Sequence, residues 1–353
     1  MTSFPLTGLF LSLCSTLTAL SVMSVSVAAS TLAVAEGFMS TPVIGILSQP
    51  FLNNDTNETE YMIAASYVKW LEAAGARSIA IPYDTTDVDQ YFTQINGLLF
   101  PGGASDVPSS AWRLWELALD ANSIGTFFPV WGTCLGFEYI AMMASGKGQA
   151  TLQGGFDAYN MSLSLDNLVT TERTQLYSTM HIQSIASTQN VTMNNHHFGI
   201  SPESFRQSPD LTAMFRITST NTDRKGRPFV STIEPIHPDL HPFYGTQYHP
   251  EKNAFEYGTY PNTNTAYEDI HHDDDAITFS LHLAKFFVNL TKQNVRQGIH
   301  QYTQPDLYPM VYTYPMRPGI KFQQSFIIPS ASTRNQDVSW QRSAIQEPEA
   351  VLA

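Results

Sequence analysis

Short apolar runs that alternate with amphipathic segments are the feature that most constrains the fold of this chain. Runs typical of buried strands lie at Pro42–Leu47, Ser78–Pro82, Gly97–Phe100, Phe128–Trp131 and Phe243–Tyr248. Helical periodicity is found over Tyr61–Ala74, Val88–Ile95, Leu114–Leu119 and Phe137–Met143. This alternation predicts a mostly parallel central sheet with helices on both faces, which is an α/β three-layer sandwich.

The pattern changes in the second half of the chain. Between about residues 150 and 235, short strands and turns predict an antiparallel or irregular insertion. A helix is expected over Ile277–Asn294, and the acidic run His271–Asp275 before it fits a helix N-terminus better than a metal site. From Gly298 the composition shifts to Gln, Pro, Ser and Tyr. We therefore predict a folded domain over residues 40–297 and a tail over 298–353 that lies largely outside it.

The charge balance excludes several classes of protein. The 353 residues include 31 acidic and 18 basic side chains, and the net charge of −13 argues against nucleic acid as a partner. A hydrophobic content of 43% is too high for wholesale disorder, and a mean hydropathy of −0.14 is too low for a polytopic membrane protein. A soluble globular protein is the class that remains.

Residues 1–35 form a predicted secretory signal. No charged side chain occurs from Leu6 to Ala35, and Ala33–Ala35 has the small-x-small form that signal peptidase cuts. No Lys or Arg precedes Lys69, so an uncleaved membrane anchor is the alternative. Five glycosylation sequons favour passage through the secretory pathway, toward the extracellular space or a lysosome or vacuole, with no membrane contact after leader removal. The sequons begin at Asn54, Asn57, Asn160, Asn190 and Asn289.

Cys134 is the only cysteine outside the predicted leader, since the other is Cys14. An unpaired thiol in an oxidising compartment needs either burial or a chemical role. The segment Val130–Glu138 favours a role, because a buried strand, a Gly-flanked turn and a helix are typical of a nucleophile elbow. The helix N-terminus would favour the thiolate. The N–H groups of Leu135 and Gly103 are the candidate donors to an oxyanion.

A reactive thiol also needs a base, and His249 is the best placed of the ten histidines. It closely follows a strand-like run, and Glu251 lies two residues further on, where it can fix the imidazole tautomer. His237 stands in a similar His-Pro-Asp sequence, but the prolines around it leave no strand to position it. The predicted catalytic residues are therefore Cys134, His249 and Glu251.

Motifs in the chain resemble known families. Three of them together look like the class I glutamine amidotransferase fold, which is flavodoxin-like: Phe100–Gly103, Gly132–Gly136 and Tyr248–Glu251. Finer features are similar to the gamma-glutamyl hydrolase (folate-polyglutamate hydrolase) family and lie in Ile63–Glu72, Pro129–Glu138, Thr220–Asp223 and His249–Lys252. The resemblance covers about residues 42–294 and does not reach the tail.

This resemblance implies roles for further residues. Glu138, where amidotransferases usually carry Gln, would bind the α-ammonium of a γ-glutamyl group; a plain helix-surface acid is the alternative. His196 aligns with a histidine at the family's cleft, and a slip of one residue would exchange it with His197. Tyr67 resembles a substrate-side tyrosine, and a core position on its helix is the alternative. A homodimer is also implied.

The expected function is hydrolysis of γ-glutamyl bonds in folate polyglutamates, a small-molecule substrate, through a thioester on Cys134 with His249 as acid and base and Glu251 as orienting group. No metal or organic cofactor is required. A net charge of −13 repels a polyanion, which an acidic compartment or local cations such as Lys252 or Arg77 would offset. Two alternatives stay open: a glutaminase-type amidotransferase that acts on free glutamine, and a non-catalytic binding protein of the same fold.

Overall fold

The computed structural model describes residues 41–53, 57–319 and 322–331. The predicted signal peptide, the sequon at Asn54 and the end of the tail lie outside the described residues. Within these ranges, no helix combines the length and the apolar character that crossing a membrane requires.

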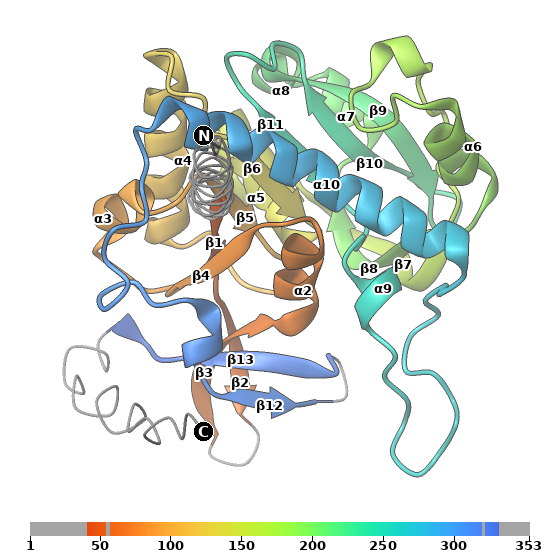
Figure 1. The fold of residues 1–353 in the computed structure, drawn as a ribbon. Helices are drawn as coiled ribbons and strands as arrows, with labels where there is room; N and C mark the ends of the chain where they lie inside the picture. The colour runs from red at the N-terminus through yellow and green to blue at the C-terminus, as the bar shows by residue number, and fades with distance from the viewer. Residues whose placement is uncertain (1–40, 54–56, 320–321, 332–353) are drawn as a thin grey trace, which may run out of the picture. The chain divides into compact units, whose positions relative to one another are not determined.

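A seven-stranded sheet forms the centre of the domain (Figure 1). Its five parallel strands are, in order, β4 (Arg77–Ile81), β1 (Val43–Leu47), β5 (Gly97–Phe100), β6 (Val130–Thr133) and β11 (Phe243–Thr246). Beyond β11 the antiparallel strands β10 (Pro228–Pro235) and β9 (Phe215–Thr222) extend the sheet. All residues of β1, β5, β6 and β11 are buried, as expected for strands that are covered on both faces. The predicted α/β fold with a mostly parallel sheet is confirmed.

Helices pack on both faces of this sheet and complete the three layers (Figure 1). One buried core contains side chains of α3 (Val88–Thr93), α4 (Ser109–Ser123), α5 (Leu135–Ser145), α7 (Pro202–Arg206) and α8 (Pro209–Met214). The other contains side chains of α2 (Ala65–Ala73), α6 (Met180–Thr188) and α10 (Asp274–Gln297). Short helices also occur at α9 (Lys252–Phe255) and, as 3₁₀ turns, at Gly148–Thr151, Thr171–Arg173 and Val311–Thr313.

The acidic run before α10 caps that helix. The carboxylate of Asp273 accepts a hydrogen bond from the N–H of Ala276 at 3.0 Å, which satisfies one of the free donors of the first turn. In the part of the chain that the structure describes, no three His, Cys, Asp or Glu side chains are grouped to hold a metal ion.

The segment between residues 150 and 235 contributes to two sheets. β7 (Gln153–Leu163) and β8 (Thr192–Gly199) pair as a separate antiparallel ladder, whereas β9 and β10 extend the central sheet. β8 matters for the site, because Asn195–Phe198 lie on it.

Two segments differ from the sequence-based expectation. The polar segment after β1 forms a hairpin of β2 (Gln49–Asn53) and β3 (Glu58–Ala64), so the helix predicted from Tyr61 begins only at Ala65. The predicted tail is not outside the fold where it is described, because β12 (Met316–Pro318) and β13 (Gln324–Ile328) join this hairpin in a four-stranded sheet. Pairing with β3 buries Phe326 and Ile328. That partner lies more than 250 residues earlier in the sequence, so local composition gives no sign of it.

Candidate active site

The candidate residues lie where neighbouring parallel strands end. Thr133 at the end of β6 is level with Thr246 at the end of β11. Cys134 follows β6 directly and His249 follows β11 by three residues, so both emerge at the carboxyl edge of the sheet, where α/β proteins bind ligands. His237 lies in the connection that enters β11, at the opposite end of that strand. Sheet topology thus separates the two His-Pro sequences.

Cys134 occupies a strained turn between β6 and α5. Its φ of 53° and ψ of −108° lie in a region that few residues other than glycine adopt. Its N–H donates to the carbonyl oxygen of Thr246 at 2.8 Å, which ties the turn to β11. A β-carbon on Gly136 would collide with the carbonyl oxygen of Phe100, and one on Gly132 would collide with the carbonyl oxygen of Gly136. Only glycine therefore allows the strand and helix to approach this closely, as a nucleophile elbow requires.

The surroundings of Cys134 disfavour ionisation of its thiol. It is a free cysteine and is 6% exposed. Burial raises its pKa well above the usual range, and the Glu138 carboxylate raises it further, while Lys252 and the N–H of Leu135 lower it. Burial therefore has a larger effect on the pKa of Cys134 than the helix N-terminus, which we expected to favour the thiolate.

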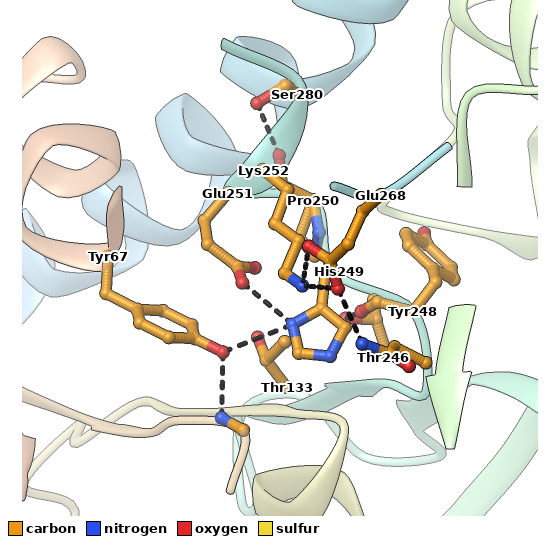
Figure 2. Close-up of polar contacts among 12 residues, drawn as sticks. Tyr67, Thr133, Thr246, Tyr248, His249, Pro250, Glu251, Lys252, Glu268 and Ser280 are labelled. Atoms are coloured by element: carbon orange, nitrogen blue, oxygen red, sulfur yellow. Dashed lines mark hydrogen bonds and ion pairs between the residues drawn. The ribbon is translucent and has the colours of Figure 1, made fainter. Parts of the chain in front are cut away.

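His249 is held in one orientation by two neighbours. Figure 2 shows Glu251 and Tyr67 pointing at the same edge of the imidazole. The Nδ1 of His249 lies 2.8 Å from Oε1 of Glu251, and because a carboxylate only accepts, Nδ1 carries the proton. The Tyr67 hydroxyl lies 3.4 Å from Nδ1 and accepts from the N–H of Gly102 at 2.8 Å. This tautomer leaves Nε2 of His249 with a free lone pair.

Gly102 marks the place where His249 and Cys134 meet. A β-carbon built on Gly102 would lie 2.7 Å from Cε1 of His249 and 3.5 Å from Cβ of Cys134. The two side chains therefore approach the same point of the backbone, and a side chain at Gly102 would collide with His249. Gly103 is also closely packed. A β-carbon built on it would lie 2.6 Å from Oε1 of Gln49.

A buried ion pair adjoins His249 and Glu251 (Figure 2). The ammonium of Lys252 donates to both carboxylate oxygens of Glu268, at 2.7 and 2.6 Å. Oε1 of Glu268 also accepts from Nδ2 of Asn195 at 2.5 Å. Both charged side chains are nearly inaccessible to solvent. The pair thus links the segment after β11 to β8, and Lys252 is not available as a free cation at the surface.

A pocket of about 570 Å³ opens in front of Cys134. Its lining includes Gly103, Leu135 and Glu138 on one part, and residues of β7 and β8 on another. Of the residues that the sequence proposed, it brings together Cys134, Gly103, Leu135, Glu138 and His196. His197 also lines it, so the structure admits both neighbouring histidines.

Two titratable side chains on the pocket side are driven toward neutrality. Burial raises the pKa of Glu138 to about 7, an effect that the hydrogen bond from Gln247 at 3.1 Å opposes. Burial lowers the pKa of His196 to about 4. Nδ1 of His196 lies 2.7 Å from the carbonyl oxygen of Phe198, so it donates there, and the buried Nε2 has no partner among the described residues. The same holds for Oδ1 of Asn195.

Several positions differ from the sequence-based expectation. Glu138 is buried rather than on the helix surface, which rules out the alternative of a plain surface acid. Tyr67 is 1% exposed, as a core position on its helix would be, and its hydroxyl faces Nδ1 of His249 at 3.4 Å, so its place on the substrate side stays a prediction. Arg77 lies at the start of the outer strand β4, with its guanidinium 5.6 Å from the Tyr302 ring centroid, away from the carboxyl edge. Sequence reasoning missed Gln49 and Glu268, which no local motif marks.

The elbow, the oriented imidazole and the pocket at the carboxyl edge of a parallel sheet define a cysteine-type hydrolase of the α/β class. The family Peptidase C26 matches residues 42–251. Gamma-glutamyl hydrolase B of Dictyostelium discoideum is 32% identical over 297 residues, covering 82% of this chain and 82% of that protein. The human gamma-glutamyl hydrolase is 35% identical over 72% of this chain and 78% of that protein, and gamma-glutamyl hydrolase 1 of Arabidopsis thaliana is 34% identical over 77% of each. The chain belongs to the peptidase C26 family.

Proposed function

We propose that this protein hydrolyses γ-glutamyl bonds of folate poly-γ-glutamates with Cys134 as nucleophile. The observation that carries this proposal is the imidazole of His249, held by Glu251 with its Nε2 lone pair free, beside the same glycine, Gly102, as Cys134. The relatives named above carry the corresponding activity in their names.

In the proposed reaction, Nε2 of His249 takes the proton of the Cys134 thiol as the sulfur bonds to the γ-carbonyl carbon. The N–H groups of Gly103 and Leu135 stabilise the oxyanion of the tetrahedral intermediate. The C–N bond then breaks, and His249 returns the proton to the departing amine. Water attacks the γ-glutamyl thioester, loses a proton to His249 and releases the thiol. A neutral resting thiol suits this order of steps, because the base acts only as attack begins.

The neutral groups of the pocket suit a polyglutamate better than free glutamine. In a γ-linked polyglutamate the α-nitrogen of each residue is acylated and uncharged, whereas free glutamine carries an ammonium that requires an anionic partner. A Glu138 side chain with a pKa of about 7 and a neutral His196 can exchange hydrogen bonds with an amide. We therefore assign Glu138 and His196 to the amide groups of the substrate, in place of the α-ammonium contact that the sequence suggested, and Tyr67 to positioning His249.

The surroundings of this reaction are part of the proposal. We propose passage through the secretory pathway to the extracellular space or an acidic lysosome or vacuole, and assembly as a homodimer. Exposed asparagines in the sequons at Asn57, Asn190 and Asn289 support glycosylation. Glycosidase treatment of the secreted protein tests the first point, and light scattering after size exclusion tests the second.

The deciding experiment follows glutamate release from pteroyl-pentaglutamate at acidic pH, with ammonia release from free glutamine measured beside it. We expect chain shortening, little ammonia, and loss of both products in Cys134→Ala. Ammonia as the main product would favour a glutaminase. Unchanged cleavage by Cys134→Ala, with native circular dichroism, would remove the proposed nucleophile. If Cys134 fails to react with a thiol reagent, a non-catalytic binding protein becomes the better account.

A further inference from the structure

Part of the pocket in front of Cys134 is aromatic. Tyr159 from β7 and His197 and Phe198 from β8 line it, together with Glu138 and the elbow. We call these three residues the aromatic wall. The pocket volume of about 570 Å³ lies in the range that accommodates ligands well above the size of one amino acid. Space and lining therefore exceed what the reacting glutamyl group needs.

The aromatic wall leaves much apolar surface open. Tyr159 is 43% exposed and Phe198 is 46% exposed. The rings of Tyr159 and His197 are stacked, with centroids 5.5 Å apart and planes within 3°. Phe198 lies beside Gly154, where a β-carbon would come within 3.2 Å of its Cε1. Aromatic rings gathered on a pocket wall form a surface that a ligand can cover, unlike single exposed apolar residues.

The backbone around these rings is fixed. The guanidinium of Arg224 donates to the carbonyl oxygen of Tyr159 at 2.6 Å and to that of Asn160 at 2.8 Å. The Nδ1 of His197 lies 3.2 Å from the carbonyl oxygen of Phe156. Because the rings belong to paired strands and are held before any ligand arrives, little ordering is lost on binding.

We infer that the aromatic wall binds a planar aryl group of the substrate, so that the enzyme selects γ-glutamyl chains that end in an aryl amide over chains of glutamate alone. The inference rests on the proposed γ-glutamyl hydrolase function. An apolar, stacked contact also provides affinity that does not depend on charge, which matters for a protein of net charge −13 acting on a polyanion. Each stacked ring contributes roughly two- to tenfold in affinity.

Two substrates with equal numbers of carboxylates test this inference. Pteroyl-tri-γ-glutamate carries the aryl group, and N-acetyl-tri-γ-glutamate lacks it but keeps the acylated α-nitrogen. The measured quantity is the ratio of kcat/KM for the two. We expect the natural protein to favour the aryl substrate by about tenfold or more, and Phe198→Ala and Tyr159→Ala to lower the ratio roughly three- to tenfold, mainly through KM.

Tyr257→Ala is the matched control. Tyr257 is 49% exposed and stacks on His272 with centroids 3.9 Å apart, but it does not line the pocket. Its replacement should leave the ratio within twofold. Phe198→Trp keeps a planar ring and should keep the preference. Equal kcat/KM for the two substrates, or an equal fall for both in the alanine variants, would overturn the inference. Failure of the natural protein to cleave either substrate would instead refute the proposed function.

Discussion

The charged side chains on the two sides of Cys134 differ in whether they form ion pairs. Behind it, His249 and Lys252 each face a buried carboxylate, at 2.8 and 2.6 Å. On the pocket side, neither Glu138 nor His196 forms an ion pair within the described ranges, and burial drives their pKa values to about 7 and about 4. Paired groups keep a fixed geometry, whereas unpaired groups become neutral and keep hydrogen-bonding capacity for a ligand. In the proposed function, the paired groups position the reacting atoms and the unpaired groups bind substrate.

The same substitution on each side should give the largest and most different effects. Glu251→Gln cannot hold the Nδ1 proton of His249 in the same way, so we expect kcat to fall about 10³- to 10⁴-fold. Glu138→Gln removes at most a hydrogen bond to an uncharged group, so KM should rise roughly two- to tenfold with little change in kcat. Steady-state kinetics on pteroyl-triglutamate measure both. A similar loss of kcat in the two variants would contradict the division between the two sides.

The Lys252–Glu268 pair should matter for stability. Lys252→Met leaves the carboxylate of Glu268 buried without its cation, and we expect the free energy of unfolding to fall by about 3–5 kcal/mol. The double variant Lys252→Met/Glu268→Leu removes both charges and should recover most of that loss. Urea denaturation at neutral pH measures each variant. Equal destabilisation in the single and double variants would mean that the pair is not the source of the effect.

Local motifs in the sequence mark the residues behind Cys134, whereas no local motif gives the environment of the residues on the pocket side. Cys134, His249 and Glu251 belong to short local motifs at strand ends, and the alternating pattern predicts the mostly parallel sheet in which β6 and β11 pair. The shifted pKa values of Glu138 and His196 could not be predicted, because they result from burial by segments distant in sequence. Glu268 reaches Lys252 from a loop with no regular periodicity. The C-terminal strands were missed for a similar reason, because β13 pairs with β3, which lies more than 250 residues earlier in the sequence.

The pH dependence of stability should have opposite signs for the two pocket-side groups. Glu138 has a pKa raised from 4.5 to about 7, so between these values the folded state holds a proton that the unfolded state has released, and stability falls as pH rises. Glu138→Gln should therefore be more stable than the natural protein at pH 8, by up to about 3 kcal/mol, with no gain at pH 4.

For His196, the expected stability falls as pH falls, the opposite of Glu138. Its pKa is lowered from 6.5 to about 4, so the unfolded state binds the extra proton in this window and stability is lost as pH falls through it. His196→Gln should flatten the acid limb of the stability profile. Melting temperatures from pH 4 to pH 8 measure both variants. If the two substitutions change the pH dependence of the melting temperature in the same direction, one of the two groups forms an ion pair in the folded protein.

The smallest effect expected is that of the Tyr67 hydroxyl, which belongs to the positioning side. It accepts from the N–H of Gly102 and faces Nδ1 of His249, but lies outside the pocket. Tyr67→Phe should lower the free energy of unfolding by about 1 kcal/mol and kcat by a few fold, with KM unchanged. Tyr177→Phe is the control. The buried hydroxyl of Tyr177 bonds to the hydroxyls of Tyr248 and Thr232, at 2.6 and 2.9 Å, so its removal should change stability alone. If Tyr67→Phe raises KM and leaves kcat intact, the hydroxyl contacts substrate, and the tyrosine belongs to the pocket side.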